Sequence, residues 1–409
     1  MTAASASGDD AVAGVAPRRV VRPASVDEVR AAVREAGARH DCLVALGRGG
    51  HRDLGGPPSR LDLVVRLDAL DRIVDHQAGD MTVTVEAGCP LAAVQSVLAG
   101  AGQWLPLDPP RPDATTIGGL VAADLSGPLR ASQGTVRDLL LGIAVVGADG
   151  ALVRGGGRVV KNVAGYDLPK LHVGAFGTLG IVVEATFKVR PRPAGEAAIV
   201  VACRSARDAA DAALAVLDAG ADPLWLEVGG AGTLPEGPGD AAALAVGVAG
   251  IPEEIAWARD LTRRACEARG LRAFDVPDGA ALRARLGAFA GEPVAPVLRA
   301  ATLPGDVGET MEALAAAGHR AGVRVRTLAH AATGVVRAVV ATADAVPRVV
   351  EALRPPLEAR GGSLVVERGA PAGVDPWGDA GAGLPLMRAV KAAFDPDGVF
   401  APGRFVGGM

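Results

Sequence analysis

The pattern of hydrophobic and polar positions predicts alternating strands and helices through residues 17–190. Residues 17–46 are predicted to form a strand, a helix and a second strand, and Ser25 followed by Glu28 has the form of an N-terminal capping box. Polar and apolar residues alternate at 82–86, which predicts a strand with one buried face. The other strands and helices expected in this part are 61–67, 90–98, 139–146, 152–153 and 181–189.

Two prolines, Pro191 and Pro193, follow the last of these strands and mark the expected domain boundary. Residues 199–228 have a strand–helix–strand pattern, and further helices fit 252–269, 306–317, 344–360 and 384–394. We therefore expect an α+β protein with domains at 17–193 and 194–380 and a C-terminal segment at 381–409. Segment 105–135 has little periodicity and is rich in Pro, Gly and Asp, which favours a functional loop region.

Composition and charge exclude several classes of function. The 409 residues carry a net charge of −4, which gives no electrostatic basis for nucleic-acid binding. The four cysteines are far apart, so an iron–sulfur cluster or a structural zinc site with the usual cysteine spacing is not expected. No signal peptide and no apolar run of transmembrane length is seen, and a cytoplasmic location is the simplest expectation.

Five glycine-containing segments follow one another in the first predicted domain. The first, Gly47-Arg48-Gly49-Gly50-His51, comes directly after the predicted strand 42–46, and closely spaced glycines let backbone N–H groups approach a diphosphate. It has neither the spacing of the Rossmann fingerprint nor the Gly-Lys-Ser/Thr of a P-loop. The other four segments are 112–122, 126–138, 162–168 and 174–182. Each alone could be an ordinary turn, but the ordered set is more specific.

This order resembles the flavoproteins of the vanillyl-alcohol oxidase type, which share an FAD-binding PCMH-type domain. The runs Lys161–Leu168 and Leu125–Pro128 and the tail 394–404 are similar to the FAD-binding subunit of bacterial glycolate oxidases. The resemblance implies FAD as cofactor. It also implies a PCMH-type domain of two α/β subdomains, an α+β (ferredoxin-like) cap domain, and a C-terminal segment that returns to the FAD domain.

The resemblance also assigns cofactor-binding residues to four of the segments. These are Gly47, Arg48, Gly49, Gly50, His51, Thr115, Thr116, Ile117, Gly118, Gly119, Ser126, Gly127, Gly177, Thr178, Gly180, Ile181 and Val182. In relatives with a covalent flavin, the histidine of a Gly-Gly-His loop carries the flavin, so His51 is either such an attachment point or a loop histidine near the diphosphate. Tyr166, the one tyrosine of the chain, is interpreted as a buried packing residue rather than a flavin-stacking one.

His330 is a candidate catalytic residue because it opens a run similar to the His-Gly-Asp-Gly-Asn-x-His motif of related hydroxy-acid dehydrogenases. Here Thr333, Val335 and Arg337 stand where the acid, the asparagine and the second histidine would be. This departure favours a structural role for His330, and no metal site is expected. The catalytic residues stay unassigned.

Oxidation of a 2-hydroxy acid needs a hydride acceptor, a base and cations for the carboxylate. The sequence supplies a flavin site but little evidence for the other two. The leading hypothesis is therefore an FAD-binding electron-transfer subunit of a glycolate (2-hydroxy acid) oxidase or dehydrogenase complex. Its partners would be a second FAD-containing subunit and an iron–sulfur subunit, and the complex could hold it at the inner face of the membrane. The alternatives are a self-sufficient FAD-dependent oxidase, with the flavin on His51, and a non-catalytic flavin-binding assembly subunit.

Overall fold

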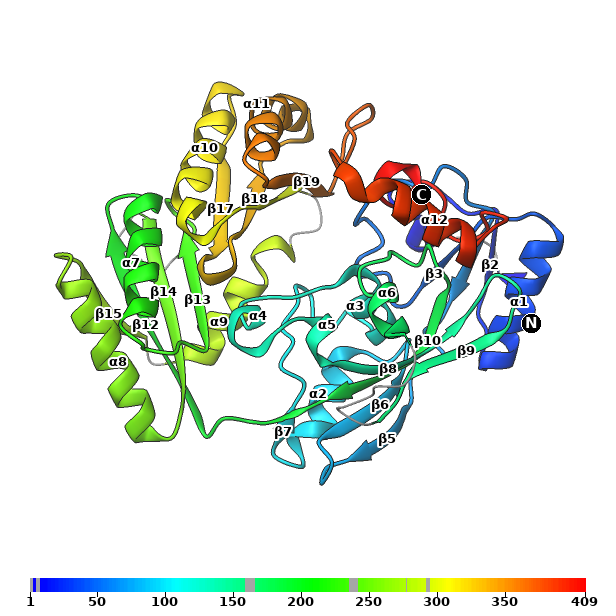
Figure 1. Ribbon diagram of the computed structural model, residues 1–409, viewed down its shortest axis with the longest axis horizontal. Coiled ribbons are helices and arrows are strands. Elements are labelled where there is room, and N and C mark those ends of the chain that lie inside the picture. The colour runs from blue at the N-terminus through cyan, green and yellow to red at the C-terminus, as the bar shows by residue number, and fades with distance from the viewer. Residues whose placement is uncertain (1–2, 5–7, 159–165, 235–241, 277, 292–294) are drawn as a thin grey trace. The chain divides into compact units, whose positions relative to one another are not determined.

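The computed structural model describes residues 3–4, 8–158, 166–234, 242–276, 278–291 and 295–409 (Figure 1). The chain divides into two compact units. Unit 1 comprises 1–125, 135–192 and 380–409, and unit 2 comprises 126–134 and 193–379. The C-terminal segment thus belongs to the first unit, as the resemblance implied. Segment 126–134, which the sequence interpretation placed in the first domain, instead belongs to unit 2.

The first sheet of unit 1 has the strand order β1-β2-β4-β3. Its strands are β1 (Ala3–Ala4), β2 (Arg19–Val21), β3 (Leu43–Leu46) and β4 (Leu63–Arg66). Strands β2 and β3 both pair with β4 in parallel. Helix α1 (Val26–Ala38) connects β2 to β3, and the Ser25 hydroxyl accepts from the Glu28 N–H as the capping box predicts. The Glu28 carboxylate reaches one residue further back than expected, to the Ala24 N–H at 2.9 Å.

The second sheet of unit 1 is antiparallel and has the order β5-β6-β10-β8-β9. The strands are β5 (Ile73–Gln77), β6 (Thr82–Glu86), β8 (Leu140–Val146), β9 (Leu152–Gly156) and β10 (Ile181–Lys188). The predicted one-sided burial of β6 is wrong, because all five residues are buried. Its polar side chains have partners: the Thr84 and Thr186 hydroxyl oxygens are 2.9 Å apart, and Glu86 binds the exposed Arg72 at 2.6 Å.

Short helices and strands complete unit 1. They are α2 (Leu91–Ala99), β7 (Gln103–Trp104), α3 (Ile117–Ala123), α5 (Val136–Leu139), α6 (Leu168–His172), β11 (Arg190–Pro191) and α12 (Leu384–Phe394), with 3-10 helices η1 (Gly8–Asp10), η6 (Gly381–Gly383) and η7 (Val406–Gly408). The region 105–135, predicted to be irregular, therefore contains α3 and, in unit 2, α4 (Arg130–Gln133). The tail joins the first sheet, because the Leu43 N–H donates to Val399 O and the Ala401 N–H donates to Leu43 O, both at 2.8 Å.

Unit 2 is built on an eight-stranded antiparallel sheet of order β15-β12-β14-β13-β17-β18-β16-β19. Its elements are β12 (Gly195–Cys203), α7 (Ala206–Asp218), β13 (Trp225–Gly229), β14 (Ala242–Gly250), α8 (Pro252–Glu267), β15 (Arg272–Val276), α9 (Gly279–Gly287), β16 (Val297–Ala301), α10 (Val307–Arg320), β17 (Val325–His330), β18 (Val335–Val340), α11 (Val346–Ala359) and β19 (Ser363–Arg368). The 3-10 helices are η2 (Phe289–Gly291), η3 (Pro304–Asp306), η4 (Ala331–Thr333) and η5 (Ala343–Ala345).

This sheet contains the predicted ferredoxin-like arrangement twice. Strands β12 to β15 with α7 and α8 form one β-α-β-β-α-β half, and β16 to β19 with α10 and α11 form the other. Each half has its fourth strand beside its first and its third between its first and second. The halves meet where β13 pairs with β17. The sequence has no repeat at fixed period, so this duplication is visible only in the connectivity.

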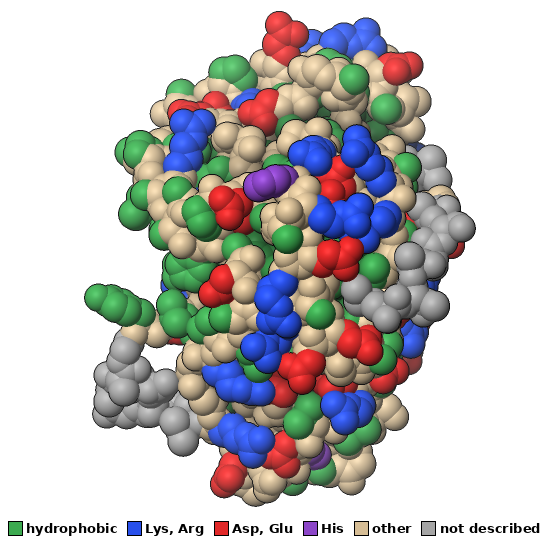
Figure 2. All heavy atoms as spheres, turned by 90° about the vertical axis from the view of Figure 1, so that its right-hand side faces the viewer, with side chains coloured by type: hydrophobic (Ala, Val, Ile, Leu, Met, Phe, Trp, Pro, Cys, Tyr) green, Lys and Arg blue, Asp and Glu red, His purple; other side chains and the backbone are tan. Residues whose placement is uncertain are grey.

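Side chains of both charges are mixed on one face of the molecule. Figure 2 shows Lys and Arg side chains beside Asp and Glu side chains over one face of the molecule. On and near α1, for example, Arg19 pairs with Glu35 at 3.0 Å and Arg30 pairs with Asp27 at 2.9 Å. In the described part of the chain, no helix has both the length and the apolar character needed to cross a membrane.

Candidate functional site

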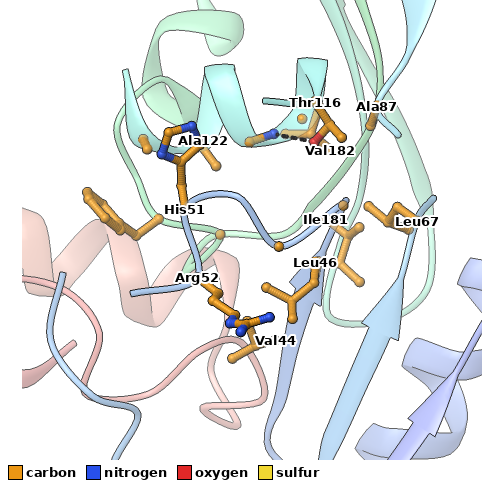
Figure 3. A pocket seen from close by; sticks show the side chains of 18 of the residues that line it. Val44, Leu46, His51, Arg52, Leu67, Ala87, Thr116, Ala122, Ile181 and Val182 are labelled. Carbon is orange, nitrogen blue, oxygen red and sulfur yellow. Dashed lines mark hydrogen bonds between the residues drawn. The ribbon is translucent and has the colours of Figure 1, made fainter. Parts of the chain in front are cut away.

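A cavity in unit 1 collects several of the glycine-containing segments. The empty space within it, together with the open solvent at its mouth, is about 910 Å³. Its walls are the end of β3 with the loop after it, the residues around α3, and the segment from α6 to the start of β10 (Figure 3). The described residues that line it are Val44, Ala45, Leu46, Gly47, Gly49, Gly50, His51, Arg52, Leu67, Ala87, Ala114, Thr116, Gly118, Gly119, Ala122, Ala123, His172, Ala175, Phe176, Gly177, Gly180, Ile181, Val182 and Arg404.

The loop after β3 needs glycine for steric reasons. A Cβ at Gly50 would lie 2.6 Å from the carbonyl oxygen of Ala114, and a Cβ at Gly47 would overlap the Thr116 side chain. Gly49 has φ +77°, a conformation that L-residues with a side chain rarely adopt. The first and second segments therefore pack backbone against backbone, and this contact brings them to the same wall of the cavity.

Hydrogen bonds fix the residues where these two segments meet. The Thr116 hydroxyl accepts from the Gly119 N–H at 3.4 Å and caps α3 (Figure 3). His51 Nε2 lies 2.6 Å from Thr115 Oγ1. The Thr115 hydroxyl is directed at backbone carbonyls, at 2.9 Å from Arg111 O, so it accepts from His51 and the imidazole carries its proton on Nε2. His51 and Arg52 point in opposite directions from the loop in Figure 3.

The cavity carries positive charge and no carboxylate among its described lining residues. Arg52 and Arg404 are the two arginines. Burial lowers the pKa of Arg404 to about 10, which still leaves it charged at neutral pH. Burial also lowers the pKa of His172 to about 4, so this imidazole is neutral there. Such a lining favours an anionic ligand group.

Most of the predicted cofactor residues line this cavity, and six do not. Those that do are Gly47, Gly49, Gly50, His51, Thr116, Gly118, Gly119, Gly177, Gly180, Ile181 and Val182. Arg48 is exposed, while Thr115, Ile117 and Thr178 are buried behind the wall. Ser126 and Gly127 belong to unit 2 and are absent from the lining. The assignment of the lining residues to FAD stays a prediction at this point.

The fourth segment, around 162–168, lies mostly outside the described residues. The interpretation of Tyr166 as a buried residue is wrong, because its side chain is 93% exposed. Sequence reasoning missed four large side chains of the cavity: Arg52, His172, Phe176 and Arg404. Arg52 directly follows the first segment, Phe176 lies within the fifth, and Arg404 closes the tail motif, so each was adjacent to a recognised signal. His172 had none.

His330 lies in unit 2, within a buried network of charged side chains. Its Nδ1 is 2.6 Å from Glu227 Oε1, and its Nε2 is 2.8 Å from Arg337 Nη1. Arg337 in turn donates to Glu367 at 3.1 Å. Burial, followed by the charge of Arg337, holds the pKa of His330 well below its usual value. The imidazole is therefore neutral, with Nδ1–H donating to Glu227 and Nε2 accepting from the guanidinium.

The described residues contain no group of three or more His, Cys, Asp or Glu side chains placed to hold a metal ion. The position that would be the second histidine of the resembled motif is Arg337, whose Nη1 lies 2.8 Å from His330 Nε2.

Comparisons with known proteins give the class of this site. The family model for an FAD binding domain matches residues 17–156, and the model for the C-terminal domain of FAD linked oxidases matches residues 240–405. Among curated proteins, glycolate oxidase subunit GlcE of Escherichia coli K12 is 41% identical over 152 residues, which is 37% of this chain and 43% of that protein. D-2-hydroxyglutarate dehydrogenase of Xanthomonas citri pv. viticola is 36% identical over 177 residues, 43% of this chain and 38% of that protein.

The chain thus spans about two fifths of the length of these relatives. Among solved structures, an alkyldihydroxyacetonephosphate synthase has the same fold with a TM-score of 0.70 at 15% identity, and the match covers 94% of this chain and 76% of that one. The cavity also fits the cofactor of this family, since its glycine-lined backbone, two arginines and lack of carboxylates suit a diphosphate. The chain thus contains a PCMH-type FAD binding domain with FAD as its cofactor and the C-terminal domain of FAD linked oxidases, and it resembles the glycolate oxidase subunits.

Proposed function

We propose that this chain is the FAD-carrying electron-transfer subunit of a complex that oxidises a small 2-hydroxy acid of the glycolate type. The cavity residues of unit 1 would hold FAD, with the loop 47–52 and Thr116 to Gly119 on the diphosphate side. FAD supplies a centre that accepts a hydride or single electrons. A second FAD-containing subunit would carry the substrate site, and an iron–sulfur subunit would take the electrons onward.

The state of His330 is the observation that carries this assignment. A base for hydroxy-acid oxidation needs a free lone pair to take the substrate hydroxyl proton. The Nε2 lone pair of His330 already accepts from Arg337 at 2.8 Å, and Nδ1–H donates to Glu227 at 2.6 Å. This histidine therefore supports a structural role, and substrate oxidation would take place on a partner.

A second candidate, a self-sufficient dehydrogenase, is favoured by a specific similarity. Several relatives are named as dehydrogenases of D-2-hydroxyglutarate or D-lactate. In that case the flavin would be reduced by substrate on this chain alone, with His51 as the residue for covalent attachment.

Anaerobic mixing distinguishes the two candidates. The FAD-loaded chain would be mixed with glycolate, D-lactate or D-2-hydroxyglutarate, and flavin absorbance followed near its visible maximum. We expect no bleaching with the chain alone and bleaching once the co-expressed partner subunits are present. Rapid bleaching of the isolated chain would establish the self-sufficient enzyme instead. Absence of bleaching in the assembled complex, with dithionite still reducing the flavin, would favour the non-catalytic assembly subunit.

A further inference from the structure

The guanidinium groups of two arginines bind backbone carbonyls of the glycine-rich loop in unit 1. Arg404 donates from Nη2 to Leu54 O at 2.6 Å, and its Nη1 lies 3.4 Å from Arg52 O and 3.5 Å from Gly56 O. Arg111 donates from Nη1 to Gly50 O at 2.7 Å. Four carbonyls of the loop 50–56 are thus bound to guanidinium groups.

The backbone N–H donors of two glycines in this loop are available to a ligand. Within the described residues, the N–H groups of Gly49 and Gly50 form no hydrogen bond, and both residues line the cavity. Backbone N–H groups in a closely spaced glycine loop are the usual donors to phosphate oxygens. Carbonyl oxygens near the same anion would repel it, and this repulsion is reduced when a guanidinium binds them.

Arg404 is held in place by several independent contacts. Its side chain is 5% exposed, and its own carbonyl accepts from the Gly56 N–H at 3.0 Å. The next residue, Phe405, stacks on Phe176 of the cavity wall with ring centroids 6.0 Å apart. A buried, fixed guanidinium keeps a set geometry, so it can determine the shape of the loop and is not a mobile counter-ion.

Arg111 contributes from the second segment. Its φ is +54°, unusual for a residue with a side chain, and its carbonyl accepts from the Thr115 N–H at 3.0 Å. The same residue therefore shapes the turn before Thr115 and binds the loop through Gly50. Backbone conformations of this kind persist where the surroundings enforce them, often at ligand sites.

We propose that Arg404, assisted by Arg111, is a positioning residue for the FAD diphosphate. The two guanidiniums hold the carbonyls of the loop, and the N–H groups of Gly49 and Gly50 are thereby presented to the phosphate oxygens. Affinity for the cofactor then depends on a residue at the far end of the sequence from the loop it orders. This inference concerns FAD affinity and holds whether or not the chain is a complex subunit.

Titration of the apoprotein with FAD, followed by the quenching of flavin fluorescence, tests the proposal. Arg404→Met is expected to raise the Kd for FAD about tenfold to a hundredfold, and Arg111→Met, which loses one bond to a loop carbonyl, by about tenfold. Arg404→Lys should also weaken binding, since an ammonium cannot replace the planar fork. The control Arg154→Met, at an exposed β9 arginine paired with Glu184, should stay within twofold of wild type.

Two further measurements separate positioning from other roles. Displacement of FAD by ADP should show the same loss of ADP affinity in Arg404→Met, whereas a loss confined to FAD would overturn the diphosphate assignment. Thermal unfolding of each apoprotein shows whether the variant is folded. If Arg404→Met is unfolded, the Kd of Arg111→Met for FAD tests the proposal in its place. A folded Arg404→Met with unchanged Kd, or an Arg404→Lys that binds like wild type, would overturn the proposal.

Discussion

One of the two histidines that line the cavity, His172, is a buried group whose proton uptake opposes folding. His172 is 6% exposed and its ring contacts Phe394 edge-on, with centroids 6.0 Å apart. Its pKa of about 4 lies below the value near 6.5 that it takes in the unfolded chain. Between these two values the unfolded chain binds a proton that the folded chain does not, so stability falls as pH falls below 6.5.

We therefore predict that His172→Phe reduces the acid sensitivity of the apoprotein. Between pH 7 and pH 5 the wild type should lose about 2 kcal/mol more of its free energy of unfolding than the variant does. Urea unfolding at the two pH values measures both losses. The exposed His319→Gln serves as the control and should lose as much as wild type. Equal losses in wild type and His172→Phe would show that His172 is not neutral in the folded protein.

At the scale of elements, the junction of β13 and β17 joins the two ferredoxin-like halves through few residues. Glu227 and His330 face each other across this junction, as do Val228 with Ala329 and Gly229 with Leu328. Glu227 is fully buried and its carboxylate accepts from the imidazole, so a polar contact lies at the seam of the sheet.

A double-mutant cycle tests this contact. His330→Leu removes the donor to a buried carboxylate and should cost about 3–5 kcal/mol of unfolding free energy. Glu227→Leu leaves a buried donor unpaired and should cost about 1–3 kcal/mol. The double variant should cost clearly less than the two single costs added together, because no polar group of the pair is then left alone. Urea unfolding of all four proteins measures this, and simple additivity would contradict it.

The sequence could predict elements whose signal is local. Ser25 with Glu28 sets the start of α1, and the run from Ile181 ends as a strand before Pro191, because capping and proline chemistry act over a few residues. The β13–β17 junction could not be foreseen, since edge-to-edge pairing depends on residues about 100 positions apart and carries no periodic signal. The same holds for the site. The glycine-rich segments were recognisable in the sequence, whereas Arg111 and Arg404 contact residues that are distant along the chain, and no local pattern marks those contacts.

At the scale of the whole molecule, the chain crosses between its two units four times. It leaves unit 1 after Leu125, returns at Thr135, leaves again after Arg192 and returns at Ala380. Within unit 2, segment 126–134 is held by the Ser132 hydroxyl, which donates to Leu224 O at 2.6 Å. Neither unit is therefore a continuous stretch of sequence, and the family match to the C-terminal oxidase domain ends inside unit 1.

This interleaving makes the last 30 residues part of the FAD unit, which leads to a prediction about truncation. Residues 380–409 contact β3, where the Ala401 N–H donates to Leu43 O, and the loop between β3 and β4, where the Ser59 N–H donates to Pro402 O. They also carry Arg404. A chain that ends at Asp379 should lose FAD during gel filtration, because the tail contacts and the guanidinium disappear together. A chain cleaved at an inserted protease site between Ala372 and Gly373, an exposed turn, should keep it, because the tail contacts survive without the peptide bond. Co-elution of FAD absorbance with protein measures both, and retention of FAD by the truncated chain would show that the tail is dispensable for the site.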